Sequence, residues 1–223
     1  KSLLNRKESK FNEFYEGLVN DKFNTDEEAA AILYNTSPLD DKYRQLKSRF
    51  SKRLLNTLFF LDSNDPSFSD YHRANYSCNK NWAQIRILLN SGARNAAIKI
   101  AAKTLGVAVI YRFSDMILNC SRILMNNASL NGDEKEYEEY AALTNKALRD
   151  VEFEIKAEEM YQRLTINFAL SAASTGELAS TADKYLDAVN KLCEQSDSYQ
   201  LHYMKYQIRI MVAQIKGQYL QTI

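Results

Sequence analysis

Arginine and asparagine side chains recur along the segments that we expect to form the first helix of each of several helix pairs. Their guanidinium and amide groups can hold a peptide backbone, a carboxylate or a chain terminus. If these segments line one concave surface, that surface would bind a protein or peptide; the alternative is that they are ordinary solvated positions. The candidate ligand-binding residues are Asn79, Arg86, Asn119, Arg122, Asn126, Arg163, Asn167, Tyr206 and Arg209.

Residues that could support catalysis or bind a metal are few. The two histidines, His72 and His202, have no Cys, Asp or Glu partner at metal-ligand spacing. Asp40 and Asp41 could suggest the paired carboxylates of a metal-dependent synthase, but their place in the first turn of a predicted helix explains them. Phosphate-binding glycine loops, Gly-x-Ser-x-Gly and His-Glu-x-x-His are absent from the sequence. We therefore expect no enzymatic activity, no cofactor and no metal site.

The charge balance argues against a polyanionic partner. Formal net charge is +1, with 29 basic and 28 acidic residues, so no global field favours nucleic acid or an anionic membrane. One segment stands out, with six cations in twelve residues: Lys42, Arg44, Lys47, Arg49, Lys52 and Arg53. They spread around the predicted helix and no stacking aromatics interleave with them, which favours a solvated face.

The cysteines and the hydropathy pattern bear on localisation. Cys78, Cys120 and Cys193 lie far apart within apolar helical patterns, which is typical of reduced thiols in a core. The sequence contains no run of about 18 uncharged apolar residues, the minimum for a spanning helix. We expect a soluble, cytoplasmic protein with no membrane partner.

The elements that must position the candidate residues are predicted to be helices. With two prolines and six glycines among 223 residues, the chain has too few turn-formers for a many-stranded sheet. In the N-terminal part we expect helices over residues 2–19, after the capping box Thr25–Glu28, and from an N-cap at Ser37 with Pro38 in the first turn to Leu61. The loop over residues 62–69 predicts a boundary between an N-terminal helical segment, 1–65, and a repeat region, 66–223.

Glycines mark a period in the repeat region. Gly92, Gly132, Gly176 and Gly217 are spaced by 40, 44 and 41 residues, and each separates two apolar helical segments. A glycine just past a helix end can adopt the left-handed conformation of a helix cap, so we expect these four to form the turn within each pair. The first helices are predicted over residues 71–90, 114–129, 157–173 and 198–216. Where one helix ends between Arg149 and Ile155 is left open, because no helix breaker lies there.

The helix pairs resemble tetratricopeptide (TPR) repeats. The best match is Gly92 to Asp133, where Ala96-Ala97, Ala101-Ala102, Leu105 and Tyr111 alternate small and large packing residues as such repeats do. The resemblance covers Tyr71 to Ile223, although the period exceeds the usual length of about 34 residues. It implies an all-α, TPR-like α-α superhelix, a right-handed solenoid of antiparallel helix pairs whose first helices line the concave surface.

Two functions are compatible with these features. The first is a non-catalytic scaffold that binds a protein or peptide through its concave surface. The alternative is a regulatory or sensor module of a larger signalling or transcription-regulating protein, suggested by a last helix pair that Ile223 cuts short. We expect the sequence to be a fragment of a longer chain.

Overall fold

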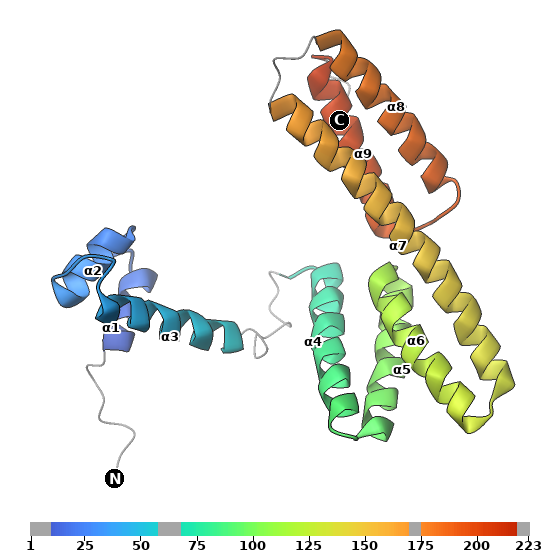
Figure 1. Ribbon diagram of the computed structural model, residues 1–223, viewed down its shortest axis with the longest axis horizontal. Coiled ribbons are helices and arrows are strands. Elements are labelled where there is room, and N and C mark those ends of the chain that lie inside the picture. The colour runs from blue at the N-terminus through green and yellow to red at the C-terminus, as the bar shows by residue number, and fades with distance from the viewer. Residues whose placement is uncertain (1–9, 58–67, 170–174, 218–223) are drawn as a thin grey trace. The chain divides into compact units, whose positions relative to one another are not determined.

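The computed structural model describes residues 10–57, 68–169 and 175–217, and in these ranges every regular element is an α-helix (Figure 1). The chain divides into two compact units, residues 1–62 and 63–223. The expected boundary at residue 65 lies outside the described residues, and the expected packing of the N-terminal segment on the repeats stays a prediction. No helix in the described part of the chain is long and apolar enough to cross a membrane.

The N-terminal unit packs three helices around an aromatic core. These are α1 (Lys10–Val19), α2 (Asp26–Tyr34) and α3 (Asp41–Thr57). The Phe14 ring lies at the centre, with its centroid 4.9 Å from that of Phe50 and 5.7 Å from that of Phe23. Phe23 covers Gly17 so closely that a Cβ on Gly17 would lie 2.2 Å from its ring. A side chain at position 17 would therefore displace this ring.

The two predicted helix starts in this unit had different outcomes. The N-cap at Thr25 is confirmed, because Thr25 Oγ1 accepts a hydrogen bond from the Glu28 amide at 3.2 Å; the Glu28 side chain accepts from the Asn24 amide at 2.8 Å, one residue before the position that a full capping box requires. The predicted N-cap at Ser37 is wrong. Residues 37–40 form a turn, in which the Asp40 amide donates to the Ser37 carbonyl. Helix α3 begins at Asp41, three residues after the start that an N-cap at Ser37 would give. Asp40 Oδ1 accepts from the Lys42 amide at 2.8 Å and takes the capping role.

The C-terminal unit contains six helices in the residues described. They are α4 (Asp70–Asn90), α5 (Arg94–Tyr111), α6 (Ser114–Asn131), α7 (Glu134–Ala169), α8 (Thr175–Cys193) and α9 (Tyr199–Ile215). Each helix packs against the next in the chain, and α7 also packs along α9. The predictions for α4, α6 and α9 are confirmed to within two residues, because short turns with Ser or Gly bound these helices.

The helix α7 is unbroken over 36 residues. Its first half is the second helix of one predicted pair, and its second half is the first helix of the next (Figure 1). The sequence left the junction at 149–155 open. The structure shows that the helix continues through it, so the prediction of a separate helix beginning at residue 157 is wrong. Without Gly, Pro or a capping residue in left-handed conformation, nothing interrupts the backbone hydrogen bonds there. At 1.5 Å per residue, α7 is about 54 Å long.

The left-handed conformation expected of the turn glycines is confirmed at three of the four positions, and the helix expected after Gly217 lies outside the described residues. Gly92, Gly132 and Gly217 have φ angles of 79°, 70° and 67°, in the left-handed region that favours glycine. The prediction for Gly176 is wrong, because this residue lies in the first turn of α8. Residues 170–174, which precede α8, lie outside the described part of the chain.

Two hydrophobic cores lie along α7. One is built by α4, α5 and α6 around Ile85, Ala101 and Cys120, with Tyr140 and Leu143 of α7 packed against it. The other is built by the second half of α7 with α8 and α9, around Leu164 and Ile208. The apolar faces of the helices are therefore buried in two separate cores, one along each half of α7.

A polar junction lies where the middle of α7 meets the starts of α6 and α9. We use this name for Ser114, Asp150, Glu154, Ser196 and Ser198, all of them buried. Ser196 Oγ donates to Asp150 Oδ1 at 2.6 Å, and Ser198 Oγ donates to Glu154 Oε1. Ser114 also hydrogen-bonds the Glu154 side chain. Hydroxyl donors and the positive ends of two helices thus stabilise two carboxylates that are largely removed from water.

The pKa of Glu154 is raised, chiefly because burial penalises its charged form, while hydrogen bonds from Ser114 and Ser198 act against the shift. Between the ordinary value of 4.5 and this raised pKa, the folded chain binds more protons than the unfolded chain. The stability from Glu154 is therefore fully present below about pH 4.5 and is lost as pH rises through the raised pKa.

We expect Glu154→Gln to remove this dependence. The free energy of unfolding of the wild type, minus that of Glu154→Gln, should increase as pH falls from neutral toward about 4.5. Asp26 and Asp197, whose pKa values are lowered by Lys47 and Lys146, are present in both proteins and cancel. Urea denaturation at a series of pH values measures the difference. A difference that decreases in this range would contradict the assignment.

Candidate functional site

A groove between α4 and α6 is the candidate site. It has a volume of about 370 Å³. We call it the α4–α6 groove, and its lining consists of Trp82, Arg86, Leu89, Arg94, Asn119, Arg122, Ile123, Met125 and Asn126. Four of these, Arg86, Asn119, Arg122 and Asn126, are among the nine candidates from the sequence. The structure therefore brings together residues of two predicted first helices, 33 positions apart from Arg86 to Asn119 in the chain.

Helical spacing explains why these side chains share a surface. On α4, Trp82, Arg86 and Leu89 follow one another at intervals of four and three residues, which places them on one stripe. On α6, Asn119, Arg122 and Asn126 do the same. Cys78 and Ile85 form the neighbouring stripe of α4, and Cys120 and Leu124 lie on the opposite side of α6; all four are buried in the core. The packing of the core therefore fixes the direction of both polar stripes.

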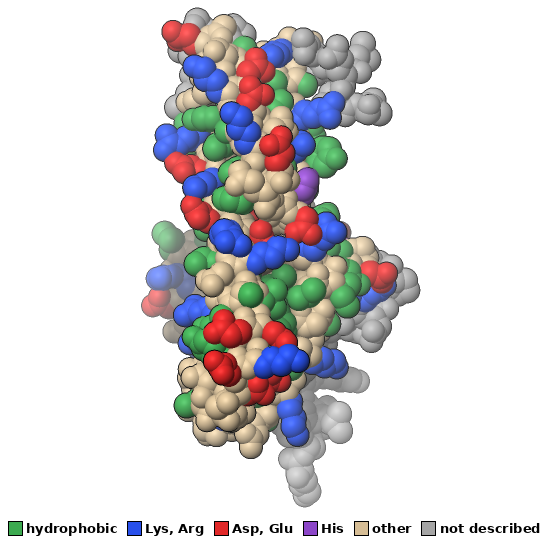
Figure 2. Space-filling model, turned by 90° about the vertical axis from the view of Figure 1, so that its right-hand side faces the viewer, with side chains coloured by type: hydrophobic (Ala, Val, Ile, Leu, Met, Phe, Trp, Pro, Cys, Tyr) green, Lys and Arg blue, Asp and Glu red, His purple; other side chains and the backbone are tan. Residues whose placement is uncertain are grey.

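The groove is electropositive. Arg86, Arg94 and Arg122 all line it, and its lining includes no Asp or Glu. Among the described residues, no carboxylate lies within ion-pair distance of these three guanidinium groups. By contrast, Lys and Arg lie among Asp and Glu over the face drawn in Figure 2. An anion entering the groove would meet three cations that need not first leave an acidic partner.

Two contacts orient the arginines. The Arg86 guanidinium carbon lies 5.7 Å from the centroid of the Trp82 ring, a distance at which cation and π face attract. Arg94 Nη2 donates to Asn126 Oδ1 at 3.2 Å and thereby links the start of α5 to α6. Each contact restricts a long side chain that would otherwise lose more rotamer freedom on binding a ligand.

The groove combines charge with apolar surface. Leu89, Ile123 and Met125 supply aliphatic contacts beside the partly buried Trp82. The lining holds no group that titrates near neutral pH and no hydroxyl or thiol nucleophile. Such a surface can bind a carboxylate-bearing chain that also carries an apolar side chain, and it offers no general acid or base.

The other five candidates lie outside the groove. Asn79 is exposed on α4, and its amide donates to the side chain and the carbonyl of Asn75. Arg163 of α7 pairs with Glu159 at 2.6 Å. Asn167 is exposed near the end of α7, and Tyr206 and Arg209 are exposed on α9. Their role in binding stays a prediction.

Five lining residues were not among the candidates: Trp82, Leu89, Arg94, Ile123 and Met125. Trp82 both packs against the core and faces the groove. Arg94 was omitted because it starts a second helix, outside the predicted first helices. Its place two residues after the turn glycine Gly92 was the available indication that it could reach across the turn.

Other reactive side chains form no site. In the described ranges no three His, Cys, Asp or Glu side chains are grouped so that they could hold a metal ion. Cys78, Cys120 and Cys193 are free thiols, and Cys78 and Cys120 are buried. Burial raises the pKa of Cys78 to about 11 and that of Cys120 to about 12, so both stay protonated and unreactive at neutral pH.

Comparison of the chain with protein-family models, with curated proteins and with solved structures finds no match.

Proposed function

We propose that this protein is a non-catalytic, TPR-like scaffold of the cytoplasm that binds an acidic segment of a protein or peptide in the α4–α6 groove. In this proposal α4–α9 belong to a right-handed solenoid whose first helices line the concave side. The consecutive packing of the helices in chain order is compatible with such a solenoid. The sharing of α7 between two pairs distinguishes this chain from repeats in which a turn follows every helix.

The observation that carries the proposal is the convergence of Arg86, Arg94 and Arg122 on one concave surface without a carboxylate partner among the described residues. Guanidinium groups bind carboxylates in a planar, two-bonded geometry and are more weakly hydrated than ammonium groups. Asn119 and Asn126 can hydrogen-bond the peptide backbone between such contacts. An acidic ligand with one apolar residue would satisfy both parts of the lining.

Selection from a random-peptide library tests the proposal without knowledge of the partner. Peptides enriched on the full chain should carry Asp or Glu, and Arg122→Glu should weaken their binding by at least about tenfold, because an attraction becomes a repulsion. Fluorescence polarisation with the selected peptides measures the effect.

Arg149→Glu is the matched control. It makes the same change of charge on an exposed arginine of α7 that does not line the groove and is not among the candidates. Binding by Arg149→Glu should equal that of the wild type. Equal weakening by both substitutions, or enrichment of peptides without acidic residues, would contradict the proposal.

A further inference from the structure

Charge is segregated within the N-terminal unit. Helix α3 carries six cations and one carboxylate, a net charge of +5 over 17 residues. The preceding residues 10–40 carry seven carboxylates and two lysines, a net charge of −5. The two charges cancel over residues 10–57, although α3 itself is strongly basic.

The structure distinguishes the cations that the sequence treated alike. Lys47 pairs with Asp26, and the Arg53 guanidinium lies 5.1 Å from the centroid of the Phe11 ring. By contrast, no carboxylate of the described residues lies within ion-pair distance of Arg49 or Lys52. Arg44 has only a loose, exposed contact of 3.7 Å with Asp41.

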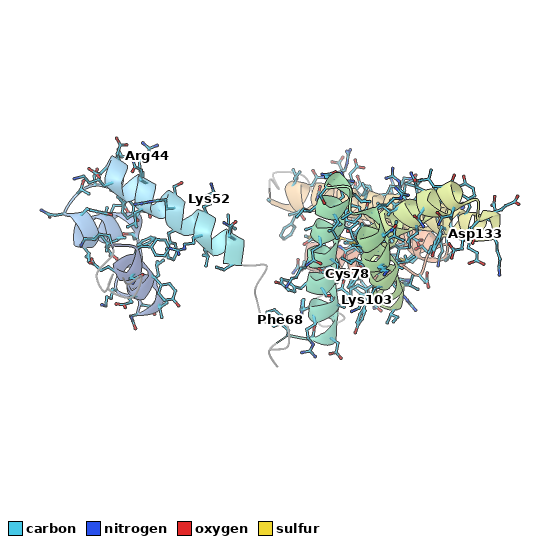
Figure 3. All side chains as sticks on the ribbon, turned by 90° about the horizontal axis from the view of Figure 1, so that it is seen from below. Arg44, Lys52, Phe68, Cys78, Lys103 and Asp133 are labelled. Atoms are coloured by element: carbon cyan, nitrogen blue, oxygen red, sulfur yellow. The ribbon has the colours of Figure 1, made fainter. Side chains whose placement is uncertain are left out.

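These cations lie on or beside the outward side of α3. The inward residues Tyr43 and Leu46 are buried. Opposite Leu46, at intervals of four residues, lie Arg44, Ser48 and Lys52, all exposed, and Arg49 flanks this row. Figure 3 shows Arg44 and Lys52 extending from the side of α3 that faces away from α1.

The C-terminal part of α3 is more exposed than its first half. Every side chain from position 51 to 57 is exposed, although Arg53 still lies over the Phe11 ring of α1. At 1.5 Å per residue, Arg44 and Lys52 lie about 12 Å apart along the axis, close to the width of the major groove of B-DNA.

Contrary to the expectation from the overall charge balance, we infer that α3 binds a nucleic-acid duplex, with Arg44 and Lys52 contacting phosphates from its outward face and Arg49 from beside it. Gln45 and Ser48 lie between these cations and can donate or accept hydrogen bonds at phosphates or base edges. The same mixture argues against a membrane surface, because a helix that lies in a bilayer interface needs a broad apolar face. The acidic residues of α1 and α2 would repel phosphate and so orient the duplex toward α3.

Fluorescence anisotropy of the full chain with a labelled mixed-sequence DNA duplex of about two helical turns tests the inference. Three phosphate contacts predict that affinity falls roughly 40-fold between about 50 mM and about 200 mM salt. In the combined variant Arg44→Ala, Arg49→Ala and Lys52→Ala, affinity at the lower salt should fall at least about tenfold. Its salt dependence should fall to about threefold or less.

The combined variant Lys99→Ala, Lys103→Ala and Lys135→Ala is the control. It removes the same charge from exposed positions of the C-terminal unit and should bind the duplex as the wild type does. Far-UV circular dichroism checks that both variants stay helical. Equal loss in both variants, absence of duplex binding by the wild type, or tighter binding to vesicles containing phosphatidylserine or to polyglutamate would each overturn the inference.

Discussion

Ser198→Ala should lower the free energy of unfolding by about 2–4 kcal/mol, because one hydroxyl has two buried partners. Ser198 Oγ accepts from the Leu201 amide at 3.2 Å and so caps α9, a contribution of about 1 kcal/mol. The same hydroxyl donates to the buried carboxylate of Glu154, and a hydrogen bond to a charged group contributes about 1.5–3 kcal/mol. Urea denaturation followed by circular dichroism measures the loss.

Ser69→Ala provides the matched control. Ser69 caps α4 through the His72 amide at 3.3 Å, but it is exposed and touches no buried charge. Its removal should cost about 1 kcal/mol or less. If the two substitutions had equal effects, the contact between Ser198 and Glu154 would contribute nothing to stability.

Leu164→Ala should destabilise the protein by about 2–5 kcal/mol. Leu164 is fully buried in the core formed by the second half of α7 with α8 and α9. Truncation removes apolar contacts and leaves a cavity that the surrounding helices fill only in part. The midpoint and slope of urea denaturation, recorded by the near-UV signal of the tyrosines and by helicity, report the change.

Ile166→Ala lies two residues away and is the comparison for Leu164→Ala. The Ile166 side chain is 56% exposed, so its truncation should change stability by no more than about 0.5 kcal/mol. Similar costs for the two substitutions would mean that the second half of α7 does not present Leu164 to a core.

The sequence predicts the helices where local chemistry decides them. Helices α4 and α6 end at Asn90 and Asn131, just before turn glycines, and α9 begins directly after its capping residue Ser198. The preferences of these residues act within a few positions of the chain. The two errors also arise at this level. Ser37-Pro38 suits a helix start, but Asp40 rather than Ser37 caps α3. Gly176 suits a helix end, but it lies in the first turn of α8.

The α4–α6 groove could be predicted only in part, because it depends on which helices lie side by side. The expectation that first helices share a surface correctly places Arg86 and Arg122 at one site. The same expectation does not place Arg163, because the length of α7 and its pairing with α9 set the direction of that side chain. Arg94 was missed because its role depends on the contact with Asn126 of the next helix, 32 residues further along the chain.

The unbroken α7 makes the number of residues in it a structural quantity. Adding one residue to an α-helix turns everything beyond it by about 100° and shifts it by 1.5 Å. An insertion between Tyr140, which packs on the first core, and Leu164, which packs in the second, would rotate one half of the C-terminal unit against the other. An insertion in the turn at Gly92 imposes no such rotation on the helices that follow. We therefore expect insertions and deletions to be tolerated at this turn and to disrupt the C-terminal unit when they fall within α7.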